Sequence, residues 1–126
     1  MKKITSFMAI SILAFSHTAF SVEDVIPGPG LSKNISQIVS RDSGYHAIFL
    51  VSTTFTNTDS CDLNDRGVLN ENEAPGNKTM YATAAAAFLA GIPVQLATNG
   101  CINTNGGGAT TTSPKITKIK LVAPTP

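Results

Sequence analysis

The sequence predicts an α+β fold, in which a small antiparallel sheet packs against one alanine-rich helix. Three observations indicate this class: an alanine-rich stretch without proline, β-branched and aromatic segments on both sides of it, and two cysteines that bracket it. The expected order is two strands, a polar loop, the helix and two further strands. Strands grouped around a single helix, rather than alternating with several, are typical of α+β domains.

Residues 1–21 have the pattern of a signal peptide. Lys2 and Lys3 make a positively charged start, and Ile4–Phe15 form a largely apolar core. The apolar run is too short to span a bilayer comfortably, and no second run follows it. A core helix at the N-terminus is the competing interpretation. We therefore expect an exported protein, periplasmic or secreted, without a membrane span.

Small residues at Ala19 and Ser21 lie at the two positions that a signal peptidase reads. We expect cleavage between Ser21 and Val22, with cleavage after Ala19 as the alternative. The exported part, 22–126, has a size that suits one domain with one modest core. Its last four residues, Ala-Pro-Thr-Pro, are expected to be disordered.

The exported part is nearly neutral. The whole chain has 9 Lys and Arg against 8 Asp and Glu, and Lys2 and Lys3 leave with the signal. A nucleic-acid-binding domain would show a basic stripe, and a membrane-surface helix would carry a basic face. We therefore expect neither nucleic acid nor a membrane surface as the partner.

Cys61 and Cys101 are the only two cysteines, so one intramolecular pairing is available. A disulfide implies an oxidising compartment. Closing a loop of about 40 residues stabilises a fold by roughly 3–4 kcal/mol in the chain-entropy model. Two thiols without nearby histidines do not complete a zinc shell, so we expect no metal and no cofactor.

Two strands are expected before the helix. Glu23–Gly30 contains Pro-Gly-Pro-Gly, which predicts an irregular lead-in. Lys33–Ser40 is expected to be the first strand and Tyr45–Phe55, rich in β-branched and aromatic residues, a long second one. The turn signal Arg41–Gly44 joins them into a hairpin.

Thr56–Lys78 is expected to be a solvated polar loop pinned by the disulfide, with a short strand at Val68–Leu69. Its acidic residues raise calcium binding as an alternative; they are Asp59, Asp62, Asp65, Glu71 and Glu73. However, the spacing of Asp59, Asp62 and Asp65 does not match the alternating ligands of an EF-hand loop, and the expected glycine is missing.

The helix is expected at Thr79–Ala90, because alanine is the best helix former and Gly91 is typical of a left-handed helix end. Met80, Ala84, Ala87 and Phe88 share one face. We expect Ala82, Ala86 and Phe88 to face the strands, against Ile48, Leu50, Val94, Leu96, Ile116 and Ile119. About 12 residues are marginal alone, so the helix needs this packing; a membrane-active or partner-binding helix is the alternative.

Two strands are expected after the helix. Pro93–Thr98 is a short strand, and Asn99-Gly100 is a turn signal. Ile102–Ser113, with three consecutive glycines, is expected to be a mobile exposed loop, since the Gly-Lys-Ser/Thr of a phosphate-binding loop is absent. Lys115–Val122 is expected to be an edge strand whose lysines guard its open side.

The stretch AFLAGIPVQLATNGC, followed by PKITKIKL, resembles the B subunits of bacterial AB5 toxins of the subtilase-cytotoxin and pertussis-like kind, and their small exported relatives. The resemblance implies an OB-like barrel, a homopentameric ring and binding of cell-surface glycans. In the relatives a cysteine ahead of the helix pairs with the one after the following strand, which corresponds to Cys61 and Cys101. No motif carries the glycan-contacting residues over, so the ligand-binding residues stay open.

We expect the exported domain to have a non-catalytic binding or interaction role, with a cell-surface glycan or a protein as partner. The alternative is a glycan-binding B subunit of an AB5-type toxin, with Tyr45 or Tyr81 as candidate contacts. No catalytic residue is assigned, because His46 is the one histidine of the exported part and lies in an apolar strand. The sequence also has no G-x-S-x-G or H-E-x-x-H motif.

Overall fold

The computed structural model describes residues 23–103 and 111–123. The expected signal peptide (1–21), its cleavage site between Ser21 and Val22, the glycine run and the last three residues of the tail lie outside these ranges. The elements are β1 (Asp24–Ile26), β2 (Ile35–Ser40), β3 (Tyr45–Leu50), β4 (Gly67–Asn70), α1 (Asn77–Ala90), β5 (Val94–Asn103) and β6 (Thr112–Leu121). The short strand expected at Val68–Leu69 is confirmed as part of β4.

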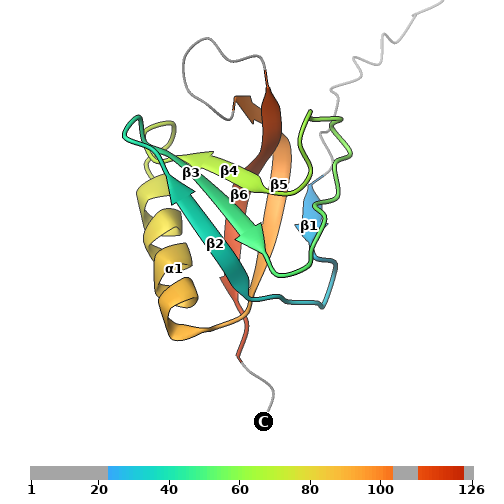
Figure 1. The fold of residues 1–126 in the computed structure, drawn as a ribbon, viewed down its shortest axis with the longest axis vertical. Coiled ribbons are helices and arrows are strands. Elements are labelled where there is room, and N and C mark those ends of the chain that lie inside the picture. Colours follow the sequence, from blue (N-terminus) through green and yellow to red (C-terminus); the bar gives the residue numbers. More distant parts are fainter. Residues whose placement is uncertain (1–22, 104–110, 124–126) are drawn as a thin grey trace, which may run out of the picture.

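The six strands form one mixed sheet in the order β1-β5-β6-β4-β3-β2, with α1 packed on it (Figure 1). The α+β class is therefore confirmed. A purely antiparallel sheet is not, because β4 and β6 are parallel neighbours with Val68 opposite Lys115, whereas the other neighbouring strands are antiparallel. The helix and β5 intervene between β4 and β6, which supplies the crossover that a parallel pair needs.

The sheet is not closed, but it is curved enough to bring its distant strands together. Lys33, two residues before β2, pairs with Val94, the first residue of β5. The Lys33 N–H donates to the Val94 carbonyl at 3.0 Å, and the Val94 N–H donates back at 2.8 Å. The β2 edge of the sheet thus meets the strand next to its β1 edge.

The core lies between the curved sheet and α1. The fully buried helix residues are Ala84 and Ala87, and Met80 packs beside them, as the predicted shared face requires. The sheet contributes Ile26, Ile35, Ile48, Leu50, Leu69, Val94, Leu96 and Ile116, and Phe55 joins them from the loop. The two fully buried contacts of the helix are thus alanine methyl groups, with the larger Met80 at the margin of the core.

The expected orientation of the helix was partly wrong. Ala82 and Ala86 are exposed, because each lies two residues from Ala84 and about 200° around the helix from it. Phe88 keeps 41% of its surface exposed and Leu89 keeps 84%. The helix ends as predicted at Gly91, whose φ of 67° is left-handed.

The lead-in and the second strand also differ from expectation. Asp24–Ile26 is not irregular: it pairs antiparallel with β5, with Ile26 opposite Leu96. The second strand ends at Leu50 rather than Phe55, and Ser52 takes a positive φ of 46° just after it. Phe55 is nevertheless buried, because the chain turns back over the core.

The expected turn at Asn99-Gly100 is a bulge inside a longer strand. The register between β5 and β6 shifts between Thr98 and Cys101, and Gly100 has a φ of 76°. A left-handed glycine is typical of a bulge that bends a strand without ending it. The predicted loop at Ile102–Ser113 therefore begins too early and ends too late, since Ile102 and Ser113 pair in the sheet.

Lys115–Val122 is also not an edge strand, because β6 lies between β5 and β4 and the edges are β1 and β2. Lys118 and Lys120 are exposed. They project from the solvent-exposed face of the sheet instead of guarding an open edge.

Candidate functional site

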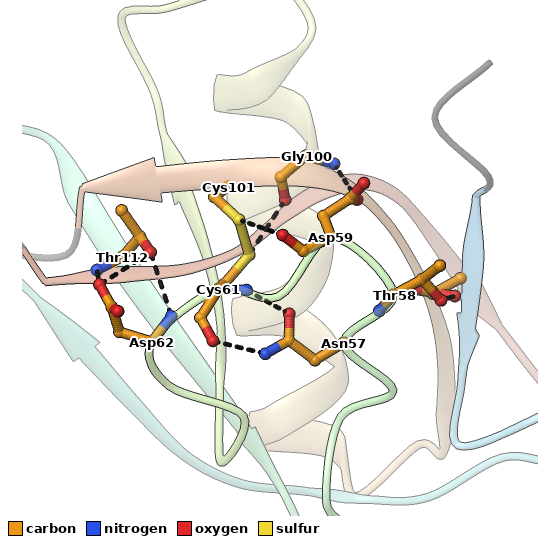
Figure 2. Close-up of a disulfide and its surroundings, with 9 residues drawn as sticks. Asn57, Thr58, Asp59, Cys61, Asp62, Gly100, Cys101 and Thr112 are labelled. Atoms are coloured by element: carbon orange, nitrogen blue, oxygen red, sulfur yellow. Dashed lines mark hydrogen bonds between the residues drawn. A yellow bond between two sulfur atoms is a disulfide. The ribbon is translucent and has the colours of Figure 1, made fainter. Parts of the chain in front are cut away.

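The predicted disulfide between Cys61 and Cys101 is confirmed, with a Cα–Cα distance of 5.6 Å. It ties residues 56–65, here called the Cys61 loop, to β5 (Figure 2). Cys61 is buried, whereas Cys101 is exposed. The bond is compatible with an oxidising location outside the cytoplasm.

Carboxylates of the Cys61 loop and of the neighbouring strand β1 attach the loop to its surroundings (Figure 2). Asp24 accepts hydrogen bonds from the backbone N–H of Thr58 at 3.0 Å and from its hydroxyl at 2.6 Å. Asp59 accepts from the Gly100 N–H at 2.8 Å. Asp62 accepts from the Thr112 N–H at 2.9 Å. These bonds replace the secondary structure that the loop lacks.

The acidic residues considered for calcium do not gather into a ligand set within the described residues. Asp65 instead forms a bidentate pair with Arg66 at 2.8 and 3.0 Å, and these bonds hold the pKa of the Asp65 carboxyl below its usual value. Among the described residues, no group of three or more His, Cys, Asp and Glu side chains could hold a metal ion.

A second polar group lies at the other end of the molecule, where β2, β3 and α1 meet. We call Ser40, His46, Glu71 and Tyr81 the His46 cluster. His46 Nδ1 lies 2.8 Å from Ser40 Oγ, and His46 Nε2 lies 3.0 Å from Glu71 Oε2. The Ser40 and Tyr81 hydroxyl oxygens are 3.2 Å apart.

The fold places these residues by simple alternation. His46 has the same parity as Ile48 and Leu50 on β3, so it points inward and is 5% exposed. Ser40 is directly opposite His46 in the β2–β3 hairpin. The ring of Tyr81, from α1, stacks on the imidazole with centroids 3.6 Å apart and an interplanar angle of 12°.

The hydrogen bonds of the cluster can all run in one direction, with each donor in turn from Tyr81 through Ser40 and His46 to Glu71. The Glu71 carboxylate can only accept when ionised, so it places the imidazole proton on Nε2. The unprotonated Nδ1 then accepts from the Ser40 hydroxyl, and the Tyr81 hydroxyl can donate to Ser40 Oγ. A buried imidazole is satisfied in this way at both ring nitrogens.

A hollow of about 430 Å³ begins at Glu71; we call it the Glu71 hollow. Its lining residues are Glu71, Asn72, Glu73, Ala74, Pro75 and Lys78. A smaller hollow of about 250 Å³ shares Glu73 and Ala74 and extends to Lys115. Carboxylate, amide and ammonium groups in an open depression suit a polar ligand rather than an apolar one.

The sequence pointed to His46 and Tyr81 separately and to Glu71 only as one acid of a polar loop, and Ser40 was missed. The predicted hairpin could have identified Ser40 as a neighbour of His46, because a turn at Arg41–Gly44 brings the end of the first strand beside the start of the second. Tyr45 starts β3 with the opposite parity to His46 and pairs with Asn70, so it lies outside the cluster. The expectation of no catalysis relied on a histidine without partners, and it stays a prediction.

Within the described ranges, no helix has the length and apolar character that a membrane crossing requires. Comparison with known proteins does not add a family. No model of a protein family matches the chain, and no curated protein matches it.

Proposed function

We propose that this chain is a small exported domain that acts by binding, with the Glu71 hollow as its binding site. The observation that carries the proposal is the position of the hollow beside the His46 cluster. The rigid ring stack and the hydrogen bonds hold Glu71 in place, and a fixed group costs less to order when a ligand binds. Export is supported by the signal-like start and by the disulfide.

We further propose that the architecture is OB-like. The parallel β4–β6 pair, the helix between β4 and β5, and the contact of Lys33 with Val94 support a partly open barrel. In this reading β1 and β2 are two halves of one bent strand, and β3 and β4 are the second and third strands. OB folds bind oligonucleotides and oligosaccharides over these strands and the neighbouring loops.

The candidate ligand that a specific observation favours is a glycan, as in the B subunits of AB5 toxins. Sugar hydroxyls both donate and accept, and the Glu71 hollow offers acceptors at Glu71 and Glu73 and donors at Asn72 and Lys78. The nearly neutral charge gives no support to a nucleic acid. A protein partner without glycan recognition is the competing role.

The test is a glycan array probed with the purified mature chain and three variants. Binding that disappears in Asn72→Ala and Lys78→Ala, but persists in Lys120→Ala, is expected, because Lys120 is an exposed lysine that does not line this hollow. Absence of signal for every glycan would remove the glycan candidate. Light scattering of the same sample then separates a pentameric ring from a monomer, which is the form expected for the competing role.

A further inference from the structure

The His46 cluster has the order of groups that activates a serine toward acyl compounds. Such a site needs a hydroxyl within hydrogen-bond reach of a base, and a third group that orients the base. Here the hydroxyl is Ser40, the base is His46 and the third group is Glu71. Ser40 Oγ lies 2.8 Å from His46 Nδ1, and His46 Nε2 lies 3.0 Å from Glu71 Oε2. We propose that Ser40 is a nucleophile that accepts the acyl group of small esters, a role beyond the binding function proposed above.

The surroundings of the imidazole favour this assignment. Glu71 keeps the proton on Nε2, which leaves Nδ1 free to take the serine proton. Stacking on Tyr81 and 5% exposure hold the ring in a single orientation. Ser40 itself is exposed, so an ester can reach its oxygen.

Ser36 on the same strand shows what an ordinary serine does in this fold. It is also exposed, but its hydroxyl donates to the Phe49 carbonyl at 3.2 Å. A carbonyl oxygen cannot remove a proton from the hydroxyl, so Ser36 is the matched inactive serine.

The reaction balances with water as the second reactant. Ser40 Oγ attacks the ester carbonyl carbon as its proton moves to His46 Nδ1, and the Tyr81 hydroxyl, 3.2 Å from Oγ, is a donor for the oxyanion that forms. The C–O bond to the alcohol breaks, and the imidazolium returns the proton to the leaving alkoxide. Water then attacks the acyl-serine by the same proton route, releasing the carboxylic acid and restoring Ser40.

The substrate class follows from the surface beside the cluster. Within the described residues, Ser40 lines none of three hollows, and the Glu71 hollow reaches the cluster only at Glu71, so no groove for a long apolar acyl chain begins at the Ser40 hydroxyl. Short acyl groups, such as acetyl esters, fit this environment. Glu71 is a positioning residue in this scheme, because it contacts the imidazole and not the ester.

The test uses the mature, disulfide-bonded chain with two probes, p-nitrophenyl acetate and a small fluorophosphonate. We expect one phosphonyl adduct, located by mass spectrometry on Ser40, and ester hydrolysis above the buffer rate. Ser40→Ala should lose the adduct and about 100-fold or more of the enzymic rate, as expected when the base has no nucleophile to activate. Ser36→Ala should keep both.

Glu71→Gln supplies a readout that a purely structural role would not move. The amide introduced by Glu71→Gln can donate to Nε2 as well as accept from it, so it no longer fixes the imidazole proton there; kcat should fall while KM and the thermal unfolding midpoint stay near the wild-type values. A wild-type chain without an adduct on Ser40, or hydrolysis unchanged in Ser40→Ala, overturns the proposal. Either result leaves the glycan array untouched as the test of binding.

Discussion

The Cys61 loop and helix α1 are both attached to the curved sheet without strand pairing, but by different interactions. The loop uses one covalent bond and a series of hydrogen bonds in which carboxylates accept from neighbouring N–H groups. The helix satisfies its own backbone, so it is attached by two buried alanines and by the ring stack of Tyr81 on His46.

The difference shows which interactions each kind of segment needs. An irregular segment has backbone groups to satisfy, and side-chain acceptors and a disulfide supply what a ladder would supply elsewhere. A helix has no such requirement and depends on the fit of its surface. The loop should therefore be sensitive to loss of its attachments, and the helix to changes in side-chain volume.

The largest effect is expected from removing the disulfide. The double variant Cys61→Ala with Cys101→Ala frees a loop with a sequence separation of 40 residues. The chain-entropy model gives a loss of about 4 kcal/mol in the free energy of unfolding. Urea unfolding of the variant and of the wild type measures it, and a loss below about 1 kcal/mol would mean that the hydrogen bonds alone hold the loop.

The next effect concerns the fit of the helix. Ala84→Leu adds volume at a position with no exposed surface, inside the core cluster that the helix shares with the sheet. We expect a loss of about 1–3 kcal/mol from overpacking. Ala86→Leu, on the exposed side, is the matched control and should stay within about 0.5 kcal/mol of the wild type. Equal thermal unfolding of the two variants would contradict the observed orientation of α1.

A smaller effect is expected where β1 meets the Cys61 loop. Asp24 is 8% exposed and accepts both hydrogen bonds from Thr58. Asp24→Ala leaves these donors to water and should cost about 1–2 kcal/mol. Asp42→Ala, an exposed acid in the β2–β3 turn, should change little when measured by the same unfolding experiment. A tolerated Asp24→Ala would show that the disulfide is the sole important attachment.

The smallest effect belongs to the exposed pair of Asp65 and Arg66. Since the folded state lowers the pKa of Asp65, its contribution is present above the ordinary aspartate value near 4 and is lost as the pH falls through the lowered value. Solvent screening limits it to a few tenths of a kcal/mol. The difference in the free energy of unfolding between wild type and Asp65→Asn, measured by urea unfolding, should therefore close between pH 7 and pH 2. A difference that stays constant with pH would mean that the ion pair is not its cause.

The sequence predicted the features that depend on neighbouring residues or on simple counting. Alanine-rich composition with Gly91 at the end predicted α1 to within a few residues, and the first hairpin was found from its turn signal. The prediction failed at Asp24–Ile26. The prolines and glycines that follow indicate an irregular segment locally, whereas the strand forms by pairing with β5, which is distant in the sequence. It failed at Gly100 because a bulge and a turn share the same residue preference.

The candidate site was predicted in fragments. His46 and Tyr81 were noticed one at a time, but Glu71 was assigned to a solvated loop, since nothing in its neighbourhood indicates an imidazole partner 25 residues away. A side chain becomes a partner only when the curvature of the sheet and the position of the helix are known.

By itself the sequence determined the helix, its end, the first hairpin and the identity of the two bonded cysteines, because local propensity and the presence of only two thiols decide these features. The tertiary structure alone decided the parallel contact of β4 with β6, the place of β1 and the meeting of Ser40, His46, Glu71 and Tyr81. These depend on which distant surfaces pack together, and that choice is made by the free energy of the whole core rather than by any one segment.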